Sequence, residues 1–364
     1  MNIFSENIVF GCGGRFQLWS KIPEKFRSDV VLLVSERLKN SGKLSDFLPI
    51  DSLEIIAVPS MEPTISMVEK VREKIGSREI SALIAIGGGS VIDCGKMAAI
   101  YLEQSNKIHS MREYFEGKYQ LQPRERIFFA ALPTTAGTGA EVTNNAVIID
   151  DVTAVKKSLR DDSMIADLAL IDPELTYDCP QKIVAASGLD SLTQAIECAI
   201  SRKTTCETRR MASEAFLKVL ANLESAYSGD KEAKNIMAYA TTLGGVAFRI
   251  GGLGAAHGLA HPIGSLRHIA HGEACGILLE HILRINIEAV DKLAGELGFA
   301  SGNELIEKIV ALRNKLGVSD NFRKYDIKQE DFAFIAKNCR SGSMSCNPVA
   351  MRDEDIYELL TKIC

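Results

Sequence analysis

The segment SALIAIGGGSVIDCGKMAAIYLE (81–103) indicates the fold class of the chain. It starts as a short apolar run of the kind that forms buried strands. The run ends in Gly87, Gly88 and Gly89, and a helical pattern begins immediately after them. A buried strand that passes through a glycine turn into a helix is the repeating unit of an α/β domain with a parallel sheet.

Similar strand-like segments recur through the first half of the chain: DVVLLVSE (29–36), LEIIAVPS (53–60), RIFFAALPTT (126–135), AVIIDD (146–151) and DLALIDPEL (167–175). Helical patterns such as TISMVEKVREKIGS separate the earlier ones. After DPELTYDCP the strand-like runs stop, and the patterns from Pro180 onward are helical. We therefore predict an α/β domain over residues 1–178 and an all-helical domain over residues 179–364.

The composition excludes several classes of partner. The net charge is −5 without a long basic run, so nucleic acid is not an expected partner. No apolar run reaches the roughly 18 residues of a membrane span, and the start, MNIFSENIVFGCGG, lacks the features of a signal peptide. The nine cysteines are scattered and never form a CxxC pair, which favours reduced thiols in the cytoplasm.

Two glycine-containing loops follow predicted strands. The loop Gly87–Ser90 exposes backbone amides at a helix start, where the helix dipole favours an anionic group. The alternative is a plain strand-to-helix turn with Ser90 or Asp93 as the helix cap. The segment LPTTAGTGAEVTNNAVI (132–148) adds threonine hydroxyls beside bare backbone. Two such loops at strand ends of one sheet predict a dinucleotide at the carboxyl edge of that sheet.

An earlier glycine segment resembles a dinucleotide fingerprint less closely. GCGG (11–14) follows a strand-like run, and Glu36 comes 22 residues after Gly14, where an acid would meet the ribose hydroxyls. The spacing is G-x-G-x-x-F, however, so the third glycine is missing. We interpret this segment as a tight turn after the first strand.

Five of the six histidines lie in the C-terminal half, clustered around HGLAHPIGSLRHIAHGE (257–273). His257 and His261 are four residues apart and share a helix face. Pro262 predicts that this helix ends or kinks there, which puts His271 on a loop or at a new helix start. We interpret His268 and His281 as ordinary surface or supporting residues.

A carboxylate can complete this cluster. Asp190 and Gln194 are also four residues apart on one predicted helix. Asp190 with His257 and His271 would make a donor set for a divalent metal with an open position for substrate. The alternative is a set of hydrogen-bonded histidines beside an ordinary surface acid.

The segments GGGSVIDCGK, PTTAGTGAEVT, DPELT, SGLDSLTQAIE and HGLAHPIGSLRHIAHGEACGILL together resemble the iron-containing (group III) alcohol dehydrogenases. The resemblance implies an N-terminal dinucleotide-binding domain and a helical metal-binding, catalytic domain. It also implies that NAD(P)H binds in a cleft beside one divalent metal. Hydride would then pass between the nicotinamide and a small alcohol or aldehyde.

The resemblance also assigns roles to residues of this chain. It implies metal binding by Asp190, His257 and His271, and places His261 near the nicotinamide as the candidate catalytic residue. The implied nucleotide contacts are Glu36 at the ribose, Gly87, Gly88, Gly89 and Ser90 at the pyrophosphate, Asp93, Thr134, Thr135, Thr138, and Lys156 or alternatively Lys157.

Gln194 departs from the family pattern, which has histidine four residues after the metal aspartate. The glycerol dehydrogenase branch resembles this chain, because it uses an Asp-His-His set with zinc. Gln194 is therefore a doubtful ligand, and zinc, iron and manganese all remain candidates for the ion.

We therefore expect an NAD(P)-dependent alcohol dehydrogenase or aldehyde reductase that uses NAD rather than NADP and works as a cytoplasmic homodimer. Arg249 and Arg267 would favour an anionic aldehyde if they face the substrate. Two alternatives remain: a lyase of the dehydroquinate synthase type, and a non-catalytic nucleotide-binding homologue in which Gln194 marks a broken site.

Overall fold

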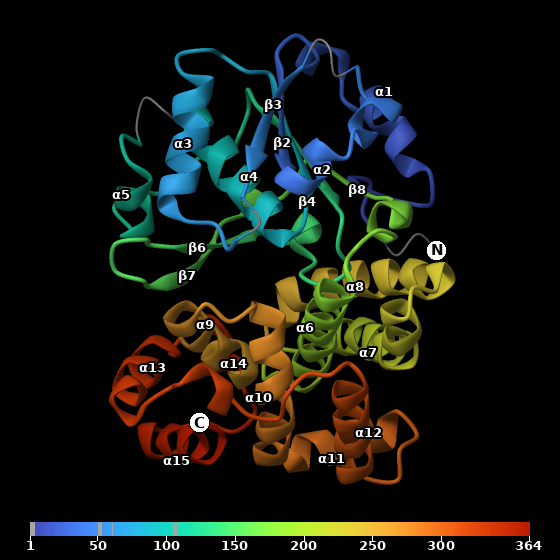
Figure 1. Ribbon diagram of the computed structural model, residues 1–364, viewed down its shortest axis with the longest axis vertical. Coiled ribbons are helices and arrows are strands. Elements are labelled where there is room, and N and C mark those ends of the chain that lie inside the picture. Colours follow the sequence, from blue (N-terminus) through green and yellow to red (C-terminus); the bar gives the residue numbers. More distant parts are fainter. Residues whose placement is uncertain (1–3, 50–52, 60, 105–107) are drawn as a thin grey trace. The chain divides into compact units, whose positions relative to one another are not determined.

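The computed structural model describes residues 4–49, 53–59, 61–104 and 108–364. The chain forms two compact units. The α/β unit comprises Met1–Thr135 and Gly139–Asp178, and the helical unit comprises Ala136–Thr138 and Cys179–Cys364. Figure 1 shows the first unit in blue to green and most of the second in green to red.

The α/β unit is built on a parallel six-stranded sheet of order β1-β8-β5-β4-β2-β3. Its strands are β1 (Ile8–Phe10), β2 (Val30–Ser35), β3 (Glu54–Val58), β4 (Ala82–Gly87), β5 (Phe128–Pro133) and β8 (Leu168–Ile171). The predicted parallel α/β fold is thus confirmed. Both central strands, β4 and β5, are buried along their whole length, as expected for a parallel sheet covered on both faces.

Helices flank this sheet. They are α1 (Leu18–Lys21), α2 (Glu36–Asn40), α3 (Ile65–Ile75), α4 (Gly89–Glu103) and α5 (Met111–Phe115). Alternate strand residues point to opposite faces, so Leu33 and Leu83 join the core under α3 and α4, whereas Leu32 and Ile84 join the core that contains Leu18. Thr64 begins α3 by accepting the backbone N–H of Met67 with its side chain.

The sequence had suggested that the segment AVIIDD extends the main sheet, but it does not. It lies in β6 (Asn145–Ile149), which pairs antiparallel with β7 (Lys156–Arg160) in a separate two-stranded sheet. The sequence of β7, KKSLR, has no apolar run. This strand forms because β6 offers a pairing edge, which is a tertiary effect.

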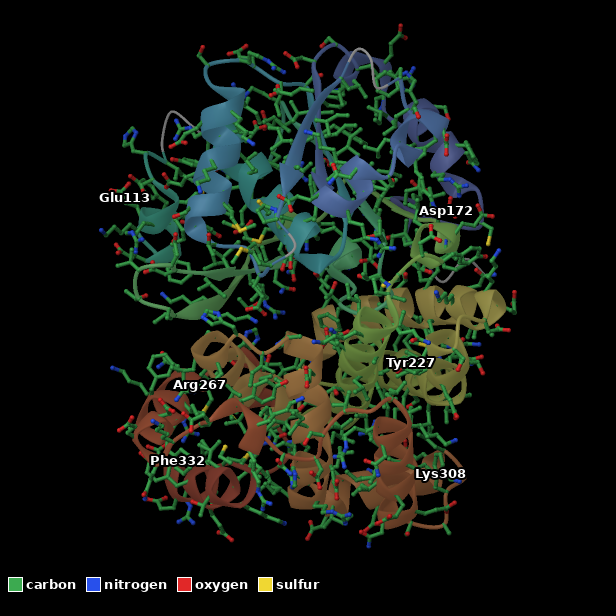
Figure 2. All side chains as sticks on the ribbon, viewed as in Figure 1. Glu113, Asp172, Tyr227, Arg267, Lys308 and Phe332 are labelled. Carbon is green, nitrogen blue, oxygen red and sulfur yellow. The ribbon has the colours of Figure 1, made fainter. Side chains whose placement is uncertain are left out.

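The early GCGG segment forms the turn that the sequence predicts. A short 3-10 helix, Gly14–Gln17, follows β1 directly. The buried carboxylate of Asp172, labelled in Figure 2, accepts the backbone N–H groups of Gly13 and Arg15 at 3.1 Å each. It also pairs with the Arg15 guanidinium at 2.7 Å, so this turn is held by a carboxylate of its own unit.

The helical unit contains α6 (Gln181–Ile200), α7 (Cys206–Tyr227), α8 (Lys231–Gly251), α9 (Ala255–Arg267), α10 (His271–Ile285), α11 (Ile287–Glu296), α12 (Gly302–Lys315), α13 (Phe332–Asn338), α14 (Gly342–Cys346) and α15 (Asp353–Ile363). One apolar core joins α6, α7, α8, α11 and α12. A second joins α9, α10, α13, α14 and α15. Helix α6 packs against α7, α8 and α10 and is central to the unit.

Helix α6 is long and apolar enough to cross a membrane, with a mean hydropathy of 1.2, but 78% of that window is buried inside the unit. Helices α8 and α9, taken together, meet the same criteria of length and composition, but the pair is bent by 103° at the junction. Burial of most of α6 explains its apolar composition.

The sequence predicted that the helix ends or kinks at Pro262, and the structure shows that it does not end there. Helix α9 continues through it to Arg267. A proline inside a helix loses one backbone hydrogen bond and costs roughly 3 kcal/mol. Every residue from Ala255 to Ser265 is buried, and the packing of this segment offsets that cost.

Candidate metal and nucleotide sites

Four side chains of the helical unit bring possible metal-binding atoms together: Asp190, His257, His271 and Cys275. Their ligand atoms all lie within 4.8 Å of one another. His257 Nε2 is 3.2 Å from Asp190 Oδ1, and His271 Nε2 is 3.8 Å from the same oxygen. Cys275 Sγ is 3.7 Å from His271 Nε2. The three residues predicted from the sequence therefore meet, and a thiol that the sequence had not suggested joins them.

Close packing of α10 on α6 makes this meeting possible. His271 is the first residue of α10, and Cys275 follows one turn later. The glycines after each of them face α6: a Cβ on Gly272 would lie 1.9 Å from the carbonyl oxygen of Ala186, and one on Gly276 would lie 2.7 Å from Leu189. Only glycine permits this approach, which places the two donors of α10 beside Asp190.

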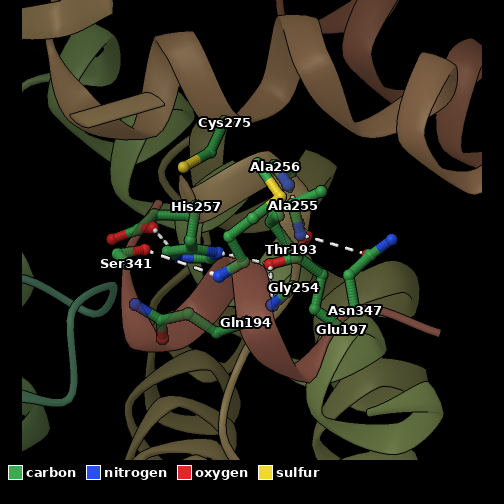
Figure 3. Close-up of polar contacts among 12 residues, drawn as sticks. Thr193, Gln194, Glu197, Gly254, Ala255, Ala256, His257, Cys275, Ser341 and Asn347 are labelled. Atoms are coloured by element: carbon green, nitrogen blue, oxygen red, sulfur yellow. Dashed lines mark hydrogen bonds and ion pairs between the residues drawn. The ribbon is translucent and has the colours of Figure 1, made fainter. Parts of the chain in front are cut away.

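Glu197 orients His257 (Figure 3). It lies seven residues after Asp190 on α6, and its Oε2 is 2.7 Å from His257 Nδ1. The same carboxylate accepts the backbone N–H groups of Gly254 and Ala256 at the start of α9. A carboxylate on the far nitrogen of a histidine fixes the ring and leaves Nε2 as the metal-binding atom.

The side chains around His257 favour a positive charge on or beside its ring. Burial lowers the pKa of His257, but Cys275, Asp190 and Glu197 outweigh that effect and raise the pKa well above the usual value. Burial raises the pKa of the Cys275 thiol to about 11. Two buried carboxylates thus stabilise a cation, either a proton on His257 or a metal ion among the donors.

Gln194 lies one turn after Asp190 and is 4% exposed. Its Nε2 donates to the backbone oxygen of Thr138 at 3.4 Å, while its Oε1 is buried and accepts no hydrogen bond from the residues that the structure describes. A buried oxygen without a donor is costly, and a cation would satisfy it. The gathered donor atoms of Asp190, His257, His271 and Cys275 fit a divalent ion.

His261 belongs to the same cluster of rings. Its centroid is 5.0 Å from that of His271, which is 5.4 Å from that of His257. His268 and His281 lie elsewhere: His268 is an exposed residue with a φ of 52° after α9, and His281 contacts the backbone oxygen of Asp320. Their interpretation as ordinary residues agrees with these positions.

The two predicted nucleotide loops are neighbours in the α/β unit. Strands β4 and β5 pair so that Gly87 faces Pro133, and Thr134 donates its backbone N–H to the oxygen of Gly87 at 2.9 Å. A Cβ on Gly88 would lie 3.6 Å from Thr135. Helix α4 begins at Gly89 without a side-chain cap, so Ser90 and Asp93 do not cap it. The backbone N–H groups of Val91 and Ile92 donate to the backbone oxygen of Gly88.

The other predicted nucleotide contacts are placed as follows. Glu36 is exposed at the start of α2, directly after β2. Asp93 is buried and accepts the backbone N–H of Val147, and burial raises its pKa to about 6. Lys156 forms an ion pair with Glu62. Thr138 belongs to the helical unit.

Comparison with known proteins places the chain in a family. Residues 5–173 match the iron-containing alcohol dehydrogenase family, and residues 184–364 match the C-terminal region of the Fe-containing alcohol dehydrogenase family. The chain belongs to the iron-containing alcohol dehydrogenase family. Together the two matches cover both units.

Similar proteins within this family are reductases and dehydrogenases. The chain is 31% identical to an NADPH-dependent butanol dehydrogenase of Clostridium saccharobutylicum over 90% of the chain and 87% of that protein. It is 30% identical to the lactaldehyde reductase of Escherichia coli K12 over 98% of the chain and 97% of that protein. The chain also resembles the structure of a sulfoacetaldehyde reductase from Bifidobacterium kashiwanohense in complex with NAD⁺. The TM-score is 0.89 at 27% sequence identity, over 98% of this chain and 96% of that one.

The chain is thus an NAD(P)-dependent alcohol dehydrogenase or aldehyde reductase of the iron-containing family, which uses a divalent metal. This finding favours the predicted dehydrogenase over the lyase and over the non-catalytic homologue. Cys275 and Glu197 were not predicted from the sequence. The position of Glu197 could have been recognised, because residues 190, 194 and 197 share one helix face.

Proposed function

We propose that this dehydrogenase reduces small aldehydes with NADH and depends on one divalent ion held by Asp190, His257 and His271. The gathering of these three donor atoms beside the Cys275 thiol carries the proposal. An ion bound there supplies Lewis acidity toward the substrate oxygen. The metal ligands and the nucleotide residues keep the roles that the family resemblance implies.

The side chains around the ion have separate tasks. Glu197 holds His257 in the orientation that directs Nε2 to Asp190. His261, whose ring lies beside that of His271, is proposed to move the proton that the new hydroxyl group requires. The apolar core around α9 and α10 excludes water from the buried side of the site.

We propose NAD as the preferred cofactor because of Glu36. Its carboxylate lies at the end of β2, where it would meet the adenosine ribose and repel a 2′-phosphate. Lys156 is a weaker part of this proposal, because its ammonium group already pairs with Glu62 and its side chain is only 3% exposed.

The substrate is proposed to be a short aldehyde without a required negative charge. Arg267, one of the two arginines that suggested an anionic substrate, forms an ion pair with Asp331. Its guanidinium is thus already neutralised within the helical unit. The similarity to a sulfoacetaldehyde reductase remains a reason to include anionic aldehydes in the assay.

One experiment tests metal, cofactor and substrate together. Protein purified without chelator is assayed for NADH and NADPH oxidation with butanal, lactaldehyde and sulfoacetaldehyde. We expect kcat/KM to favour NADH by roughly 5- to 30-fold, as one nearby carboxylate would give. Dialysis against a strong chelator should abolish turnover, and Zn²⁺, Fe²⁺ or Mn²⁺ should restore it. Full activity without bound metal would refute the proposal.

A further inference from the structure

Cys275 lies where a fourth metal donor would be expected. Its Sγ is 3.7 Å from His271 Nε2 and within 4.8 Å of the ligand atoms of Asp190 and His257. We infer that the Cys275 sulfur is the fourth protein donor of the metal centre and that it makes the centre select Zn²⁺ over the harder Fe²⁺ and Mn²⁺. This inference rests on the proposed metal dependence and adds a ligand and an ion preference to it.

The distances agree with a tetrahedral zinc site. Zinc bonds of about 2.0–2.1 Å to nitrogen or oxygen and about 2.3 Å to sulfur give tetrahedral donor–donor edges of roughly 3.3–3.6 Å. The three distances known between the donors are 3.2, 3.8 and 3.7 Å. These three distances lie within a few tenths of an ångström of such edges, and the remaining donor pairs lie within 4.8 Å.

The thiol is also placed to bind without competition from water. Cys275 is fully buried on the face of α10 that carries His271 one turn earlier. When its bond to the ion forms, the sulfur releases its proton to solvent. A soft thiolate favours zinc, whereas carboxylate-rich sites favour Mn²⁺. A fourth protein donor would be compatible with turnover if the ion accepted the substrate oxygen as a fifth ligand, as zinc sometimes does.

Gln194 is the competing fourth donor, because its Oε1 is buried and accepts no hydrogen bond from the described residues. The two donors differ in chemistry. An amide oxygen is neutral and hard, while a thiolate is charged and soft. Substituting each of them in turn therefore distinguishes which one holds the ion.

The experiment uses Co²⁺ as a spectroscopic replacement for the native ion. Chelator-treated protein is titrated with Co²⁺, and the near-ultraviolet absorption is recorded. A cobalt–thiolate bond gives a sulfur-to-metal charge-transfer band, which oxygen and nitrogen donors do not give. We expect this band in the unmodified protein and in Gln194→Ala, and its loss in Cys275→Ser.

Zn²⁺ and Mn²⁺ affinities measured by competition provide the second readout. Cys275→Ser should weaken Zn²⁺ binding at least about 10- to 100-fold, the range that even outer-shell partners show, and should change Mn²⁺ binding much less. Cys198→Ala is the matched control: Cys198 is equally buried on α6 but lies outside the donor group. It should keep both the band and the affinity.

The outcomes separate this inference from the proposed function. Co²⁺ binding without a charge-transfer band, or an unchanged band in Cys275→Ser, would overturn the role of Cys275 and leave the metal-dependent dehydrogenase intact. Failure of any divalent ion to bind, with turnover preserved, would overturn both. Equal melting temperatures of the metal-free proteins will show that Cys275→Ser folds normally.

Discussion

At the scale of single residues, the metal centre depends on which side chain completes it. Asp190, His257 and His271 supply three donors, and the family pattern would add a histidine at position 194. Here Gln194 occupies that position and keeps its Nε2 on the backbone oxygen of Thr138. If the proposed role of Cys275 holds, its thiol on α10 replaces the histidine that is missing at position 194.

We therefore predict that Gln194→Ala keeps its metal and much of its activity. The amide contributes little binding energy if three strong donors and a thiolate hold the ion. Gln194→His should add a nitrogen donor and tighten metal binding, although crowding at the position needed by the substrate can lower kcat. Elemental analysis beside kcat for the three proteins checks this. Metal loss in Gln194→Ala as complete as in His257→Ala would make Gln194 a true ligand.

At the scale of elements, the site is produced by how closely α10 lies against α6. Gly272 and Gly276 face α6 without side chains, and the donors His271 and Cys275 precede them directly. Any change that pushes α10 outward moves two donors away from Asp190 together. The spacing of these helices thus sets the geometry of the metal site.

Gly272→Ala tests this dependence. Its Cβ would lie 1.9 Å from the carbonyl oxygen of Ala186 and 3.1 Å from Asp190 Cβ, so the backbone must shift. Overpacking of this kind costs roughly 1–3 kcal/mol or more. We expect a lower melting temperature and a weakened affinity for Zn²⁺. The control is Gly295→Ala on α11, where an added Cβ meets nothing within 4 Å; that variant should retain its metal. Normal zinc affinity in Gly272→Ala would disprove the spacing argument.

Sequence patterns predicted the elements with strong local signals. The apolar run before Gly87 gave β4, and the helical pattern TISMVEKVREKIGS gave α3. Strand β7 was missed because KKSLR has no apolar pattern and becomes a strand only by pairing with β6. Helix α9 was expected to end or kink at Pro262, and the burial of this segment explains why the helix continues to Arg267.

The candidate site was likewise only partly predictable from the sequence. His257 and His271 were recognisable because histidines are rare in this chain and five of the six lie close together in sequence. Asp190 was recognisable because it lies four residues before Gln194 on one predicted helix face. Cys275 was not, since a lone cysteine is more often a small buried apolar residue. Its proximity to Asp190 is set by contacts between α6 and α10, which the sequence does not reveal on its own.

At the scale of the whole molecule, the proposed metal site and most of the proposed nucleotide contacts belong to different units, with Thr138 as the exception. The glycine loop and Thr134 and Thr135 belong to the α/β unit, whereas the metal donors belong to the helical unit. No metal donor comes from the α/β unit among the described residues. The affinities for nucleotide and for metal should therefore be separable by substitution.

We predict that removing the metal changes the Kd for NADH by less than about fivefold, below the usual range of coupling between sites. Conversely, Gly88→Ala should weaken NADH binding and leave the metal content unchanged. Its added methyl group makes only an ordinary 3.6 Å contact with Thr135, so the fold tolerates it, but the methyl would occupy space between the two loops proposed to bind the nucleotide. NADH fluorescence titration and elemental analysis on the same samples measure both effects, with His257→Ala as the reciprocal variant. If the chelated protein no longer binds NADH, the two sites are not separable. If Gly88→Ala binds NADH normally, the assignment of the nucleotide site to the Gly87–Ser90 loop is wrong.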